Sequence, residues 1–161
     1  MAQEQLKLKN QLCFPVYAAS RLIIREYQPH LERLGITYAQ YLVLMVLWET
    51  DGIPVSEITQ RLLLNTNTVT PILKRMEAQG LITRQRSSSD ERKVIVSLTP
   101  QGRELEAAAA AIPEHLVASL VSEEIAAEDL QALKEQLDVI VGYLAAKSGA
   151  VDSQEDARGS S

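Results

Sequence analysis

The sequence predicts a mainly α-helical protein that carries a single β-hairpin. Apolar residues recur at helical spacing along most of the chain, and two pairs, Thr37 with Gln40 and Thr99 with Pro100, are typical of helix starts. After Gly80, apolar and polar residues alternate, which indicates strands. The chain has 161 residues, of which 46% are apolar and 4% aromatic, so we expect one domain with an aliphatic core.

The first half of the chain has the pattern of two helices. Residues 14–33 form a long apolar-periodic segment with Pro15 in its first turn and Gly35 after its last. A capping box at residues 37–40 opens a second helix, whose body at 41–48 is apolar on all sides. A helix of that kind is buried, so we expect it at the centre of the core.

Two short helices and a hairpin follow. Residues 53–57 begin the first short helix, and Asn65 or Thr66 caps the second, which stops at Gly80. This order predicts a helix-turn-helix. Strands are expected at 81–86 and 93–98, joined by a polar loop at 87–91 that is too long for a two-residue turn. A projecting hairpin behind a helix-turn-helix is a wing, so the predicted fold is a winged helix-turn-helix.

The last part of the chain is predicted to be helical and to form dimers. Thr99 and Pro100 begin a long helix that Pro113 interrupts. A final helix at 127–146 carries apolar residues at spacings of three and four, namely Leu130, Leu133, Leu137, Ile140 and Leu144. We expect this seam to join two subunits, with packing inside one subunit as the alternative. From residue 148 onward we expect a flexible tail.

These elements define one subunit at 12–147, with a DNA-binding part at about 53–99. The dimerisation part would comprise about 12–34 and 101–146. The single cysteine, Cys13, excludes an intrachain disulfide, and two distant histidines make a structural metal site improbable, so no metal or cofactor is expected. With no membrane-spanning run or signal segment, we expect a cytoplasmic protein with no membrane partner.

Charge and side-chain chemistry point to duplex DNA as the partner. The net charge is −5, yet residues 66–93 hold six basic and three acidic residues. Phosphate contacts need a local basic face rather than a basic protein. The predicted DNA-binding residues of the second short helix are Thr66, Asn67, Thr68, Thr70, Lys74 and Arg75. Those of the hairpin are Arg84, Arg86, Asp90 and Arg92.

Within the hairpin, Arg92 is the candidate for a narrow minor groove, and Asp90 would fix its direction. The alternative is that the threonines and Asn67 are only helix caps, and that residues 90–93 only keep a loop solvated.

The stretch 90–102 resembles the wing signature of the MarR family of transcriptional regulators. It contains Asp-x-Arg at Asp90 to Arg92, a strand ending in Leu98-Thr99, and Gly102 two residues beyond Pro100. Residues 73–77 with 80–82 are similar to that family's recognition-helix exit, and the resemblance runs from about Leu12 to Pro113. It implies a two-fold homodimer that binds a pseudo-palindromic operator, with half-sites about 34 Å apart.

Residues 11–17, 27–29 and 36–41 further resemble the organic-hydroperoxide-sensing (OhrR-like) branch of that family. This resemblance implies that Cys13 is the peroxide-reactive thiol and that Tyr27 and Tyr38 hydrogen-bond it from the partner subunit. Cys13 and Tyr27 are 14 positions apart on nearly one helix. That spacing corresponds to about 21 Å, so they cannot meet within one subunit.

The chemistry expected of Cys13 follows from its place just before a helix start, where free N–H groups favour the thiolate. Attack on a hydroperoxide gives a sulfenic acid. Without a second cysteine, that product ends as a mixed disulfide with a low-molecular-weight thiol or is overoxidised. Two departures from the branch are notable: residues 65–68 read Asn-Thr-Asn-Thr instead of Asp-Ser-Gly-Thr, and Pro15 is unusual beside the cysteine.

The sequence therefore predicts a transcriptional repressor, not an enzyme, that leaves its operator when Cys13 is oxidised. The main alternative is a MarR-type regulator controlled by a small aromatic ligand in the dimer cleft, with Cys13 only a small buried hydrophobe. A thiol peroxidase that turns over at Cys13 is a second alternative, although it leaves the wing without a purpose. A purely architectural DNA-binding protein is a third.

Overall fold

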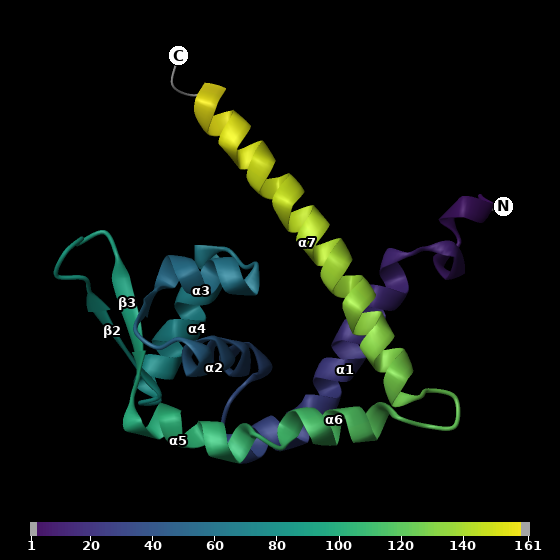
Figure 1. Ribbon diagram of the computed structural model, residues 1–161, viewed down its shortest axis with the longest axis horizontal. Helices are drawn as coiled ribbons and strands as arrows, with labels where there is room; N and C mark the ends of the chain where they lie inside the picture. The colour runs from purple at the N-terminus through teal and green to yellow at the C-terminus, as the bar shows by residue number, and fades with distance from the viewer. Residues whose placement is uncertain (1–2, 159–161) are drawn as a thin grey trace. The chain divides into compact units, whose positions relative to one another are not determined.

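The computed structural model describes the backbone of residues 3–158 and the side chains of residues 3–149. Two short 3₁₀ turns, Glu4–Leu6 and Leu8–Asn10, precede seven α-helices and three strands within this range (Figure 1). In chain order these are α1 (Cys13–Leu34), α2 (Tyr38–Glu49), β1 (Ile53–Pro54), α3 (Val55–Leu62), α4 (Thr66–Ala78), β2 (Ile82–Arg86), β3 (Val94–Leu98), α5 (Pro100–Ala109), α6 (Ile112–Leu120) and α7 (Ala127–Arg158).

The chain divides into two compact units, the first ending at Leu116 and the second beginning at Val117. No helix within residues 3–158 combines the length and apolar character needed to cross a membrane.

Helix α2 lies at the centre of the first unit, as its sequence predicts. Val43, Leu44 and Leu47 are fully buried in the core. The predicted capping box is present: Gln40 N donates to Thr37 Oγ1 at 3.2 Å, and Thr37 N donates to Gln40 Oε1 at 3.1 Å. Both bonds satisfy N–H groups that a helix start leaves unpaired, so the position of this buried helix is set by a local signal.

The predicted helix-turn-helix is confirmed in α3 and α4. Helix α3 ends at Leu62, and the next residue, Leu63, adopts a left-handed conformation at φ 54° that turns the chain toward α4. Asn65, rather than Thr66, caps α4, because its Oδ1 accepts the Thr68 N–H at 2.9 Å. The buried face of α4 is the predicted one: Val69, Leu73 and Met76 are at most 1% exposed.

The predicted hairpin is confirmed as β2 and β3, but the sheet contains a third strand that the sequence did not indicate. The order is β1-β3-β2, antiparallel throughout, with Ile53 paired to Val96 and Ile82 paired to Leu98. The expectation that residues 53–57 begin a helix was wrong for Ile53 and Pro54, which precede α3 as an extended segment. A two-residue strand is too short to show alternation, and its pairing partner lies more than forty positions away.

Helix α5 begins as predicted, with Thr99 as N-cap and Pro100 in the first turn. The expected interruption lies at residues 110–111, and Pro113 falls in the first turn of α6, where its missing N–H has no helical partner to lose.

Helix α7 forms most of the second unit. It begins at Ala127, as predicted, and its backbone stays helical to Arg158 instead of changing at residue 148. A helix that has begun gains one hydrogen bond for each added residue, so weak helix formers extend it. Residues 159–161 of the expected tail lie outside the described part. On the seam, Leu133, Ile140 and Leu144 are 48–51% exposed in this single chain.

Candidate nucleic-acid interface and thiol site

The first turn of α4 presents polar side chains to solvent. Thr66, Asn67 and Thr68 are exposed and Thr70 is half-buried. The Thr68 hydroxyl donates to Asn65 Oδ1 at 3.0 Å, which leaves the hydroxyl's lone pairs available. Free N–H groups at a helix start attract phosphate, so this turn is able to bind a DNA backbone or to approach base edges.

Four of the predicted DNA-binding residues line a common cleft of about 330 Å³, namely Thr66 and Thr70 from α4 and Arg84 and Arg92 from the hairpin. Lys93, which was not among the predicted residues, lines it too, whereas Asn67, Thr68, Arg86 and Asp90 lie outside its lining. Lys74 and Arg75 are exposed farther along α4. The fold thus brings together side chains that lie up to 27 positions apart in the sequence.

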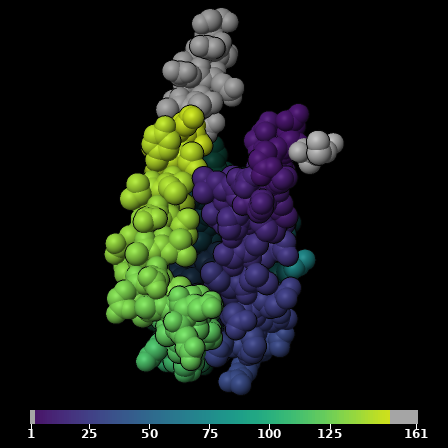
Figure 2. Space-filling model, turned by 90° about the vertical axis from the view of Figure 1, so that its right-hand side faces the viewer, coloured from purple at the N-terminus to yellow at the C-terminus, as the bar shows by residue number. Residues whose placement is uncertain are grey.

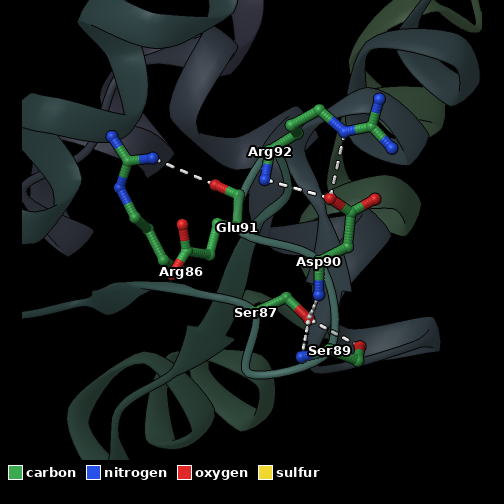
Figure 3. A network of polar contacts seen from close by, with 6 residues as sticks. All are labelled: Arg86, Ser87, Ser89, Asp90, Glu91 and Arg92. Carbon is green, nitrogen blue, oxygen red and sulfur yellow. Dashed lines mark hydrogen bonds and ion pairs between the residues drawn. The ribbon is translucent and has the colours of Figure 1, made fainter.

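At the tip of the wing, Asp90 holds Arg92 as the sequence predicts (Figure 3). Asp90 Oδ1 accepts the Arg92 backbone N–H at 3.1 Å and its side-chain Nε–H at 3.2 Å. The backbone hydrogen bond first, and the side-chain bond second, hold the pKa of Asp90 below its usual value. The Arg92 side chain remains 90% exposed, so it is oriented without being covered.

Ser87 shapes the same loop, a role that the sequence analysis missed. Its Oγ accepts N–H groups from Ser89 at 3.3 Å and Asp90 at 3.4 Å (Figure 3). Arg86 Nη1 donates to the Glu91 carbonyl at 3.0 Å. Serine and aspartate are typical turn residues, and a serine hydroxyl commonly bonds the backbone two residues on, so the run of residues 87–90 was the available signal.

Arg84 differs from the other predicted DNA-binding residues. Its Nη2 lies 3.0 Å from Glu77 Oε1, and its backbone N–H donates to Glu77 Oε2 at 3.0 Å. The Arg84 side chain is only 23% exposed, and its Nε is buried without a partner within the described residues. The side-chain hydrogen bond from Arg84 is the main cause that lowers the pKa of Glu77. Arg84 therefore fastens the wing to the last turn of α4.

Cys13 is exposed and is the first residue of α1, so the helix begins one residue earlier than expected and includes the cysteine. Its neighbours Leu12 and Phe14 are 79% and 42% exposed, so an apolar surface surrounds the thiol. This N-terminal segment, purple in Figure 2, is open to solvent on the face shown. The idea that Cys13 is a small buried side chain finds no support in the single chain.

Tyr27 and Tyr38, the predicted partners of the thiol, lie together between α1 and α2. Their ring centroids are 5.1 Å apart, and Tyr41 joins them at 6.0 Å from Tyr27 and 6.4 Å from Tyr38. Burial, followed by the neighbouring phenols, raises the pKa of Tyr27 to about 12, and burial also raises the pKa values of Tyr38 and Tyr41. At neutral pH all three are hydroxyl donors. Tyr41 was missed as a site residue, although it follows Tyr38 by one helical turn.

Cys13 and Tyr27 are both on α1, which is continuous from Cys13 to Leu34. The rise of a helix keeps them about 21 Å apart in one chain, so contact between the thiol and Tyr27 requires a second subunit. That contact stays a prediction. Beside Tyr38, a hollow of about 470 Å³ is lined by apolar Ile24, Leu31 and Ile36 and by Arg21 and Arg25.

Comparison with known proteins gives this arrangement a family. Residues 25–108, half of the chain, match the profile described as transcriptional regulator SarA/Rot. The chain is 45% identical over 145 residues to the organic hydroperoxide resistance transcriptional regulator of Bacillus subtilis, which covers 90% of this chain and 97% of that protein. It is 41% identical to the HTH-type transcriptional regulator TtmR of Methylorubrum extorquens, over 90% of this chain and 73% of the relative.

Solved structures agree with these relatives. Reduced AbfR bound to DNA matches with a TM-score of 0.70 and 39% identity, over 89% of this chain and 99% of that one. AbfR comes from Staphylococcus epidermidis. The transcriptional regulator SlyA, at 19% identity and a TM-score of 0.75, supports the fold alone. The winged helix-turn-helix, the single cysteine and these matches lead to one conclusion: the chain belongs to the MarR family of transcriptional regulators, within the organic-hydroperoxide-sensing branch, and is not an enzyme.

Proposed function

We propose that this protein is a homodimeric repressor that binds duplex operator DNA and leaves it when an organic hydroperoxide oxidises Cys13. The observation that carries the proposal is the combination of an exposed thiol at the start of α1 with a cluster of protonated tyrosines on the same fold. The similarity to the organic hydroperoxide resistance regulator of Bacillus subtilis supports the choice of oxidant.

In this proposal, α4 of each subunit enters the major groove of a pseudo-palindromic site. Thr66, Asn67, Thr68 and Thr70 stand at its leading end and contact bases or phosphates. Lys74, Arg75 and Arg86 bind phosphates, and Arg92 enters the adjacent minor groove. The DNA-bound structure of AbfR supports such a mode, and since chromosomal operators lie in the cytoplasm, we place the protein there.

The sensing step requires only Cys13 and the hydroperoxide. The thiolate sulfur attacks the terminal peroxide oxygen, an S–O bond forms, the O–O bond breaks, and the leaving alkoxide takes a proton to become an alcohol. Cys13 is left as a sulfenic acid, oxidised by two electrons. A low-molecular-weight thiol then displaces water and forms a mixed disulfide. In the reduced dimer, Tyr27 and Tyr38 of the partner subunit donate hydrogen bonds to the sulfur anion, and its oxidation removes that acceptor.

The test compares operator binding by the reduced and the hydroperoxide-treated protein while the mass of the Cys13 peptide is followed. We expect release to track the gain of one oxygen or one thiol adduct. Cys13→Ser should keep operator affinity and lose release. Release of the Cys13→Ser variant by peroxide would contradict the proposal.

A second candidate function rests on the hollow beside Tyr38. Its lining combines apolar side chains with two arginines and one carboxylate, Glu32, so its net positive charge suits a small aromatic anion. A ligand of that class would regulate the protein without thiol chemistry. A ligand that raises the melting temperature of Cys13→Ser and releases its operator would favour this alternative.

A further inference from the structure

Trp48 connects two helices that are distant in the sequence. It lies in the last turn of α2, and its indole Nε1–H donates to the Gly102 carbonyl in the first turn of α5 at 3.0 Å. Gly102 is buried, and a Cβ added to it would lie 2.2 Å from the Leu81 carbonyl oxygen. Because the Gly102 backbone is packed closely against the Leu81 backbone, the carbonyl that accepts the Trp48 hydrogen bond is held in a fixed position.

The first turn of α5 is bonded to both DNA-reading elements. The Thr99 hydroxyl donates to the Gly80 carbonyl, just after α4, at 2.6 Å. The same oxygen accepts the Gly102 N–H at 3.1 Å, and the Thr99 N–H donates to the Leu81 carbonyl at 3.0 Å. Thr99 itself directly follows β3 of the wing. A displacement of this turn moves the exit of α4 and the base of the wing together.

The other side of Trp48 faces the tyrosine cluster. Its ring meets that of Tyr41 edge-on at 6.2 Å between centroids. Tyr41 is 3% exposed and within 6.4 Å of the Tyr38 ring and 6.0 Å of the Tyr27 ring. Aromatic contacts thus run without a gap from the proposed thiol partners to the indole that holds α5.

We propose that Trp48 is the positioning residue that couples the tyrosine cluster to the DNA-reading elements. The proposal rests on the function proposed above. Close-packed interiors transmit a displacement because they cannot absorb it. When Cys13 is oxidised and Tyr38 shifts, Tyr41 pushes the indole, and the bond from Nε1 carries the shift to Gly102 and Thr99. Helix α4 and the wing then move as one body, which changes their spacing from the same elements of the partner subunit. Trp48 contacts neither the sulfur nor the DNA.

The decisive variant is Trp48→Phe, which keeps an aromatic ring and removes the N–H donor. With cumene hydroperoxide, Cys13 of the variant should oxidise at the wild-type rate, measured by mass. Reduced Trp48→Phe should bind the operator within about threefold of wild type. The ratio of oxidised to reduced dissociation constants should fall by about fivefold, the loss expected for one hydrogen bond. Glu104→Gln is the matched control, because that side chain is exposed on α5 two residues from Gly102 and the change should leave release unchanged.

A second measurement needs no variant at the indole. Trp48 is the single tryptophan of the chain, so fluorescence excited beyond the tyrosine absorption band reports on the surroundings of this indole. Its emission should change when Cys13 is oxidised in the wild type and stay constant in peroxide-treated Cys13→Ser. Constant emission in the oxidised wild type overturns the inference, and so does full release by Trp48→Phe. If peroxide fails to release the wild type, the proposed function fails instead, so the two failures are distinguishable.

Discussion

At the scale of single residues, the wing tip is organised by a carboxylate that bonds to a neighbouring arginine. Asp90 holds the backbone and the side chain of Arg92 through one oxygen, so it selects the direction in which an otherwise free cation projects. The pairing is predictable from the sequence because the two residues are two positions apart. Ser87 acts on the same loop in the same local way.

Removing this carboxylate should weaken specific binding even though it removes a negative charge near DNA. We expect Asp90→Ala to lower operator affinity by about tenfold, because Arg92 loses a charge-assisted hydrogen bond that orients it. Fluorescence anisotropy with operator and random duplexes measures the effect. Binding to random DNA should stay equal or improve slightly. An unchanged operator affinity would show that Asp90 does not direct Arg92.

The tyrosine cluster predicts a stability change at alkaline pH. The pKa of Tyr27 is about 12 in the folded chain, above its ordinary value of 10.0, so the fold favours the neutral phenol. This contribution to the free energy of unfolding is complete below pH 10 and is lost as the pH rises toward 12. Phenolate absorbance and urea unfolding, both followed across pH 9–12, check it. Tyr27→Phe should reduce the loss, whereas Tyr143→Phe, outside the cluster, should not.

At the scale of elements, the link between Glu77 and Arg84 fixes the wing against the recognition helix. Arg84 pairs with Glu77 and makes no phosphate contact in this view, so Arg84→Met should weaken operator binding. The dependence of affinity on salt concentration should stay unchanged. Lys74→Met, the comparison, should lower the slope of log affinity against log salt by about 0.9, the value for one lost phosphate contact. Operator titrations at several salt concentrations distinguish the two. An equal fall of the slope in Arg84→Met would restore Arg84 as a phosphate ligand.

Elements with local signals were predictable and those with distant partners were not. Caps at Thr37 and Thr99 place α2 and α5 correctly, because the bonds that start a helix join residues three positions apart. Strand β1 and the Glu77–Arg84 pair were missed, because a partner in another element leaves no mark on the local pattern. In the candidate sites, the residue types were predictable, while the place of Tyr41 beside Tyr27 depends on how α1 packs on α2.

At the scale of the whole molecule, the single chain leaves apolar surface that a second copy is expected to cover. Leu144 on the α7 seam is 51% exposed, and Leu12 beside Cys13 is 79% exposed. We expect Leu144→Glu to raise the dimer dissociation constant at least about tenfold, because it would bury an unpaired charge. Sedimentation equilibrium measures this, with operator affinity falling in parallel. Gln131→Lys, on the outward side of the same helix, is the control, and a similar loss of dimer there would contradict a seam interface.

The hydrogen bonds within the wing tip join residues 86–93 to one another, and this has a consequence for how operator preference changes between relatives. A loop whose conformation is set by its own residues loses little conformational freedom when it binds a DNA groove. Its contribution to affinity is therefore largely independent of the bases that α4 contacts. Substitutions in the first turn of α4 can then change which bases are preferred, while the contacts of the wing with the DNA backbone are kept. Such a protein acquires a new target in small steps without passing through a form that binds nothing.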